Sequence, residues 1–206
     1  MMAKLTWDAE ADRTYNYGVS KVVLYSDDGT KFAKWPGVTA IKETSVNSSF
    51  EELYFDGRKF YNYPSTGDYE AEVSALSFPD EFLGVLGVKE TRPGFFITNQ
   101  DRRVFHMSYQ TETSYGGYKI HIVANIVSSR ASSESKTIGD SLDPEVFSWK
   151  FSAVPPNTIT ELRPYPKVVV DSEKIDSYTL SVIEGYIYGN ETQDPTLPID
   201  NLFVNI

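Results

Sequence analysis

The chain has 206 residues, of which 40% are hydrophobic, 23% charged and 14% aromatic, a composition that excludes a disordered or collagen-like protein and suits one main domain. Nineteen Lys and Arg against 29 Asp and Glu give a net charge of -10, which excludes the basic surface typical of tight nucleic-acid binding. The lack of cysteine excludes disulfides, thiolate metal sites and a thiol nucleophile.

The N-terminal residues 1–15 hold no apolar stretch of the signal-peptide type, and no run of about 18 apolar residues follows. We therefore expect a protein that neither enters nor spans a membrane and that is made in the cytosol. The residue pattern changes near Pro155 and Pro156. This change predicts a β-rich body over residues 1–155 and a C-terminal arm over residues 156–206.

Three pairs of segments in the body predict β-hairpins. The first two surround Asp-Gly turns, and the third surrounds a longer loop with Gly116 and Gly117. The paired segments are 22–25 with 31–35, 53–55 with 58–61, and 105–111 with 118–125.

Alternation of apolar with polar residues in three runs predicts half-buried strands. The residues that share an apolar face are Tyr69, Ala71, Val73 and Ala75, then Tyr118, Ile120 and Ile122, then Phe147, Trp149 and Phe151. Packed sheets or a barrel would bury these faces, so we expect a mainly β fold, an antiparallel β-sandwich or barrel.

Two polar segments without an apolar period, 44–49 and 128–143, predict loops. The second is long for a loop in a compact domain, and such loops are usually functional or order only against a partner. Both are therefore candidates for contacts with other molecules.

The arm is predicted to contain one helix and an apolar end. Ile175, Tyr178, Val182 and Tyr186 form a stripe that predicts an amphipathic helix over residues 175–188. Asp171, Ser172 or Asp176 can cap its start, and Gly189 suits its end. The final segment, 197–206, is rich in apolar residues and has no turn signal, so we expect it to dock against protein.

The chain carries no motif of a catalytic or metal site. The GxSxG, HExxH, Walker and GxGxxG patterns are absent, and Asp140 and Asp143 lack the Gly and closing Glu of an EF-hand loop. The two histidines, His106 and His121, have no companion ligand in sequence, so we expect structural roles for them. We expect no enzyme activity, no cofactor and no metal.

Two charged pairs allow more than one interpretation. Glu70 and Glu72 share a strand face, where they fit a solvent-facing strand more simply than the acid and base of a glycosidase. Arg102 and Arg103 could bind an anion, but basic residues at the start of a strand more often pair with acidic neighbours or guard an edge.

An ordered set of segments resembles one known family. The segments are LYFDGRKF at 53–60, FPDEF at 78–82, 97–100 running into Arg102 and Arg103, FHMSYQT at 105–111, GYKIHIV at 117–123, TIGDS and FSW between 137 and 149, and 170–191. In order and spacing this set, which extends over most of the chain from Tyr17 to Glu191, resembles the major tail protein, or tail tube protein, of long-tailed siphophages of Gram-positive bacteria.

The resemblance implies a β-sandwich or barrel subunit with a flanking C-terminal helix, which closes into hexameric rings that stack into the tail tube of the virion. It implies contacts with other copies of the chain and with tape measure, tail terminator and baseplate proteins. It also implies that phage DNA passes through the tube without specific binding, and that the protein is made in the host cytoplasm.

Within this interpretation, two groups of residues are candidate functional sites. Glu70, Glu72 and Ser74 are candidates for the lumen of the tube, the alternative being that they face outward. The candidates for ring-stacking loops are Ser45, Asn47, Ser48, Ser132, Glu134 and Lys136.

Two other functions remain open. One is a carbohydrate-binding β-sandwich that uses Tyr and Trp as stacking platforms, and the other is a jelly-roll glycosidase built on acidic pairs. Trp149 alternates on a strand as core residues do, which leaves Trp7 and Trp35 as the other tryptophans for stacking.

Overall fold

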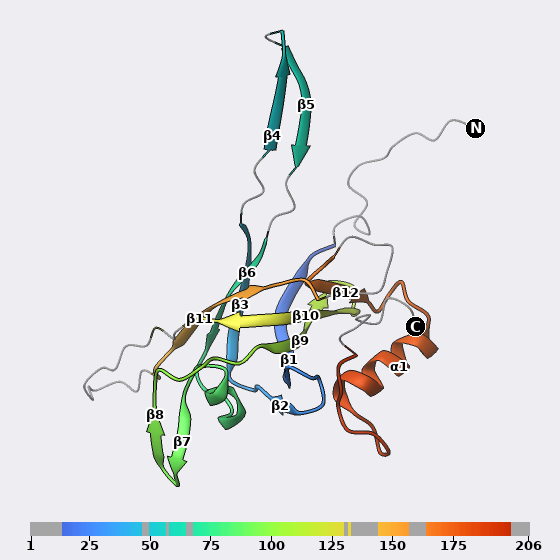
Figure 1. The fold of residues 1–206 in the computed structure, drawn as a ribbon. Helices are drawn as coiled ribbons and strands as arrows, with labels where there is room; N and C mark the ends of the chain where they lie inside the picture. The colour runs from blue at the N-terminus through green and yellow to red at the C-terminus, as the bar shows by residue number, and fades with distance from the viewer. Residues whose placement is uncertain are drawn as a thin grey trace.

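The computed structural model describes residues 14–46, 50–56, 58–64, 68–129, 132, 144–156 and 164–198 (Figure 1). These residues form a mainly β protein with one α-helix near the C-terminus, as the sequence predicts. The strands are β1 (Asn16–Ser26), β2 (Phe32–Lys34), β3 (Val38–Val46), β4 (Phe50–Phe55), β5 (Arg58–Pro64), β6 (Asp68–Ala75), β7 (Lys89–Arg92), β8 (Phe95–Ile97), β9 (Phe105–Thr113), β10 (Tyr118–Ser128), β11 (Phe147–Ala153) and β12 (Lys167–Asp171). The helices are the short 3-10 helix η2 (Asp80–Gly84) and α1 (Ser177–Tyr188).

Eight strands form one antiparallel sheet in the order β2-β1-β9-β10-β11-β6-β3, with β12 also paired to β10. On the side away from β9, strand β10 pairs with two strands in succession: residues 119–123 pair with β12 and residues 126–128 pair with β11. The sheet curls until β1 comes close to β3 without pairing with it. The result is an open barrel, and the three predicted hairpins are confirmed as β1–β2, β4–β5 and β9–β10.

Strand β1 shows how the sheet buries both of its faces. Val22, Val23, Leu24 and Tyr25 are all buried. Val22 and Leu24 pack inside the barrel, whereas Val23 and Tyr25 pack on the outer face against α1. The sheet therefore has a hydrophobic core on each face. Because this part of β1 lies between the two cores, consecutive side chains are buried instead of alternate ones.

The barrel interior is filled with aromatic side chains. Trp35, Trp149 and Phe151 are nearly inaccessible to solvent, and Phe82 from η2 contacts all three. Edge-on and tilted ring packing of this kind adds to the stabilisation that comes from burial alone. The predicted inward faces of 69–75 and 147–151 are confirmed, since their apolar residues belong to this cluster.

Helix α1 covers the outer face of the sheet. Asp176 Oδ1 accepts a hydrogen bond from Thr179 N (2.9 Å), and Gly189 ends the helix at a φ of 77°, so the predicted cap and end are confirmed. Tyr25 Oη donates to Ile187 O (2.7 Å) and thereby ties the helix to β1. No helix in the described residues combines the length and apolar character that a membrane span needs.

Two predictions in these elements are wrong in detail. The buried residues of α1 are Ile183 and Ile187, whereas Tyr178 of the predicted stripe is 77% exposed, because the helix meets the sheet along its 183/187 side. Residues 44–46 are not a loop, since they pair with 68–70 of β6 as the end of β3. Of the apolar C-terminal segment, Leu197 is buried in the outer core, and 199–206 lie outside the described residues.

Candidate assembly surfaces

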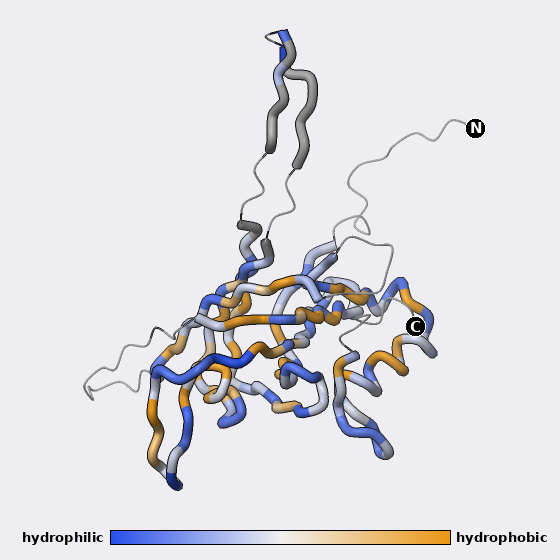
Figure 2. The backbone as a smooth tube through the Cα atoms, viewed as in Figure 1, coloured by the Kyte–Doolittle hydropathy of each residue, from blue (hydrophilic) through white to orange (hydrophobic). Residues whose placement is uncertain are grey.

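The segment 89–104 leaves the barrel as an excursion in which every residue is exposed. Strands β7 and β8 pair only with each other in the described structure, and the three residues of β8, Phe95, Phe96 and Ile97, are exposed. In Figure 2 the strand has the orange colour of hydrophobic residues. The turn between them is ordered by Glu90, which accepts from Gly94 N (2.8 Å), and by Arg92, whose guanidinium lies 5.0 Å from the Phe95 ring centroid. Three adjacent exposed apolar side chains on an ordered hairpin are typical of an interaction surface.

Sequence reasoning did not select this excursion as a contact surface. The signal that could have identified it is the apolar run of 95–97 directly after Pro93 and Gly94, followed by the polar residues 98–103. Strands that pack on a core usually show a long alternation of apolar and polar residues. The segment 89–97 lacks this alternation, which indicates that its apolar residues do not pack on the core of the chain.

Hairpin β4–β5 forms a second projection. It forms a two-stranded sheet of its own and stands well away from the barrel (Figure 1). Tyr54 on β4 is 58% exposed. An isolated two-stranded hairpin is marginally stable by itself, so β4–β5 is a second candidate for contact with another molecule.

The predicted lumen candidates lie on β6, on the sheet face opposite the aromatic core. Glu72 is exposed, while Glu70 and Ser74 are half-buried. The register places Glu72 between Lys42 of β3 and Lys150 of β11, and Glu72 accepts a hydrogen bond from Ser148 Oγ (2.9 Å). Lysines on both neighbouring strands therefore offset the charge of Glu72, whereas Glu70 has the uncharged residues Ser152 and Thr44 opposite it.

The predicted ring-stacking residues fall into three groups. Ser45 belongs to β3, where its backbone pairs opposite Tyr69. Ser132 is exposed and exchanges backbone hydrogen bonds with Ser148 (2.9 and 3.1 Å) beside β11. Asn47, Ser48, Glu134 and Lys136 lie outside the described residues.

A polar cluster lies where β3, β6, β9 and β12 meet. Glu43 accepts hydrogen bonds from Tyr109 Oη (2.5 Å), Tyr69 Oη (3.0 Å) and Lys167 Nζ (2.6 and 2.5 Å to its two oxygens). Burial raises the pKa of Glu43, but the hydrogen bonds from Lys167, Tyr109 and Tyr69 lower it further than burial raises it. A carboxylate with a depressed pKa and three donors is a weak base, so the cluster fits a structural lock between strands better than acid-base chemistry.

His121 extends this cluster and His106 lies apart from it. The His121 ring stacks on Tyr109 at 4.5 Å, and its Nε2 lies 2.9 Å from Thr111 Oγ1. His106 Nδ1 accepts from Asn125 N (2.9 Å), so its Nε2 carries the proton donated to Asp27 O (2.9 Å). Both contacts are structural, and no group of three His, Asp or Glu residues in the described part of the chain could hold a metal ion.

No family model and no curated protein matches the chain. Among solved structures, a chain of the "PVC sheath-tube complex in extended state" of an extracellular contractile injection system matches with a TM-score of 0.46 and 10% identity, over 73% of this chain and 88% of that chain. The sheath/tube terminator of the same system matches at 0.41 and 13% identity, over 76% and 97% of the two chains. The tube-terminating cap of the anti-feeding prophage matches at 0.43 and 12% identity, over 73% and 88%. Because these TM-scores are below 0.5, the assignment of a function depends on this chain's own residues and surfaces.

Proposed function

We propose that the protein is a structural subunit of a phage tail tube, which assembles with copies of itself into stacked, hexameric rings. The observation that carries this proposal is the excursion 89–104, which holds an ordered, exposed apolar hairpin outside a well-packed barrel. Among the described residues, 16–21 of β1 have no partner strand on the side away from β9 and β3 ends the sheet, so both edges offer surfaces that another chain can complete. The resemblance of the ordered sequence segments to tail tube proteins supports the same function.

In this role the negative charge of the chain has a mechanical use. Six copies at -10 each carry about -60 charges per ring, and duplex DNA carries one phosphate charge per roughly 1.7 Å. A lumen that repels phosphate lets DNA slide, whereas a basic lumen would hold it. We propose Glu70, Glu72 and Ser74 as lumen residues, with tape measure, tail terminator and baseplate proteins as the partners at the ends of the tube.

The proposal predicts self-assembly that depends on β8. Purified protein at high concentration is expected to form rings or tubes in negative-stain electron microscopy, and the double variant Phe95→Asp with Phe96→Asp to remain monomeric with an unchanged melting temperature. Carboxylates in place of both phenyl rings make burial of β8 in an interface unfavourable. The matched control is Tyr178→Asp, which alters an exposed aromatic on α1 and is expected to assemble. Tubes formed by the double variant would show that β8 is not a contact.

The lumen assignment predicts slower DNA ejection when its charge is reversed. Phage carrying Glu70→Lys and Glu72→Lys are expected to form tails of normal length and to release DNA at least several-fold more slowly, because lysines on β3 and β11 then reinforce a basic surface. Ejection triggered in vitro and followed with a DNA-binding dye measures the rate, with Glu191→Lys as a control at another exposed site. Unchanged ejection would place these residues outside the lumen.

Carbohydrate binding is the other outcome that these experiments can reveal. Trp35 and Trp149 are each 1% exposed, so neither offers a stacking platform, and Trp7 lies outside the described residues. A protein that stays monomeric at every concentration and binds an oligosaccharide would favour that function over assembly.

A further inference from the structure

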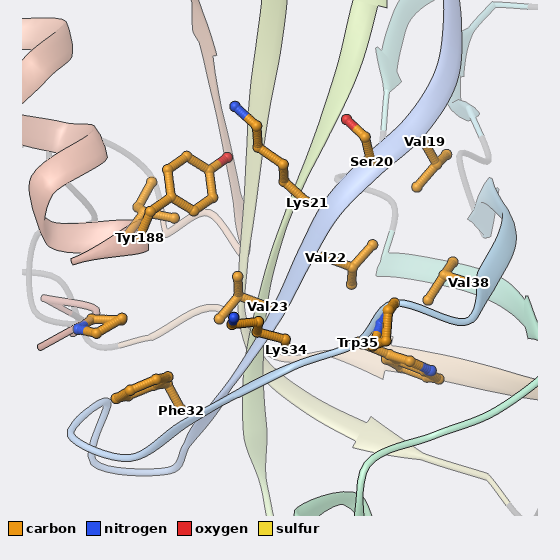
Figure 3. A pocket seen from close by; sticks show the side chains of 13 residues that line it. Val19, Ser20, Lys21, Val22, Val23, Phe32, Lys34, Trp35, Val38 and Tyr188 are labelled. Carbon is orange, nitrogen blue, oxygen red and sulfur yellow. The ribbon is translucent and has the colours of Figure 1, made fainter. Parts of the chain in front are cut away.

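An apolar groove of about 590 Å³ runs along β1 between β2 and the end of α1 (Figure 3). Its walls include Val19, Val23, Phe32, Val38 and Ile187. Lys21 and Lys34 are the charged residues among the described residues that line it. The groove is therefore suited to an apolar segment that carries negative charge.

The strand beside this groove has an unpaired edge. On the side of β1 that faces away from β9, residues 23–25 pair with β2. Residues 16–21 have no partner strand on that side in the described part of the chain. A second hollow between 16–19 of β1 and 39–41 of β3 continues from the groove at Val19. A free strand edge next to an apolar groove is the arrangement to which an added strand binds.

One polar group in the groove wall also lacks a partner. The Tyr188 hydroxyl is buried without a hydrogen bond from any residue that the structure describes, and its ring lies 5.3 Å from Lys21 Nζ. A buried hydroxyl without a hydrogen-bond partner destabilises the folded state. An occupant that supplies a backbone carbonyl or amide here would offset part of that destabilisation.

The segment after Pro198 has the pattern that this groove requires. In 199–206, alternate positions are Asp200, Leu202, Val204 and Ile206. As a strand, the segment presents one carboxylate and three apolar side chains on one face. That face matches apolar walls bordered by two lysines.

We propose that residues 199–206 of a second copy bind in this groove as an added strand on β1. The subunit's own chain already passes the groove at Pro195 and then leaves it, since the buried Leu197 donates its N–H to Gly29 O (3.0 Å) at the β1–β2 turn. The inference rests on the proposed self-assembly and specifies one contact within it.

A labelled peptide of residues 199–206 tests the binding site directly by fluorescence anisotropy. It is expected to bind the dilute, monomeric full-length protein and a variant truncated after Pro198 with equal affinity, and to bind Phe32→Glu at least tenfold more weakly. A scrambled peptide is the control. Lys34→Glu is expected to weaken binding, and a peptide with Asp200→Lys to restore it. If neither protein binds the peptide, or if only the truncated protein does, the inference is overturned, the latter because the groove would hold the subunit's own segment.

Assembly separates this inference from the proposed function. The truncated protein is expected to form no tubes at concentrations where the full-length protein forms them. Tubes from both proteins would overturn the docking of 199–206 and leave the proposed function intact. A full-length protein that stays monomeric at every concentration would overturn the proposed function itself, and with it the second copy as the occupant.

Discussion

Replacement of Phe82 by Ala is expected to lower the free energy of unfolding by about 3–5 kcal/mol and the melting temperature by roughly 6–20 °C. Phe82 is fully buried, and its ring centroid lies 4.7 Å from that of Trp35, 5.4 Å from Trp149 and 5.7 Å from Phe105. Since η2 carries this single ring into the barrel, its removal leaves a cavity that the surrounding strands cannot close.

Thermal unfolding at a concentration where the protein is monomeric measures the effect. Phe96→Ala is the matched control, because it removes the same side chain from an exposed position on β8 and is expected to change the free energy of unfolding by less than about 0.5 kcal/mol. Phe82→Leu keeps most of the volume and is expected to cost about half as much as Phe82→Ala or less. Equal effects of Phe82→Ala and Phe96→Ala would show that η2 does not contribute to the core.

Local patterns in the sequence predict a large part of the fold. The alternation around Val73 and Trp149 identifies which side chains face the barrel interior, because β6 and β11 have one buried face. Asp176 and Gly189 mark the ends of α1, because caps depend on a few adjacent residues. The side of α1 that meets the sheet depends on its docking against distant strands, so the apolar stripe through Tyr178 does not identify it.

Other features depend on contacts that no local pattern records. Strand β9 is buried on both faces, and His106, Ser108 and Gln110 are enclosed although they are polar. In the polar cluster, Glu43 binds Tyr109, which is 66 positions away in the sequence, and Lys167, which is 124 positions away. Of the candidate surfaces, the polar face of β6 can be predicted from the sequence. The exposure of β7–β8 and the groove along β1 can be recognised only once the order of the strands in the sheet is known.

The protein is expected to lose stability in acid between pH 6.5 and pH 4 because its two histidines are buried. The pKa of His121 is lowered from 6.5 to about 4, mainly by burial and further by the charges of Lys167 and Lys119, while the charge of Glu43 acts in the opposite direction. Burial also lowers the pKa of His106. Below pH 6.5 the unfolded chain binds more protons at these histidines than the folded chain does, so the free energy of unfolding falls as the pH falls. His121 alone contributes a loss of about 1–2 kcal/mol at pH 5.

Glu43 acts in a lower and separate pH range. Its pKa is depressed in the folded state, so the stabilisation that Glu43 provides is present above the ordinary value of 4.5 and is lost as the pH falls through its folded pKa.

Urea unfolding at pH 7.5 and pH 5 tests the histidine contribution with His121→Gln, which keeps a side chain able to bond Thr111 and does not titrate. The variant is expected to lose less stability than the wild type between these two pH values, whatever its stability at pH 7.5. Glu43→Gln is the control, since it removes the carboxylate and is expected to leave most of the loss between pH 7.5 and pH 5 in place. An equal loss in wild type and His121→Gln would show that the His121 ring is protonated as readily in the folded chain as in the unfolded one.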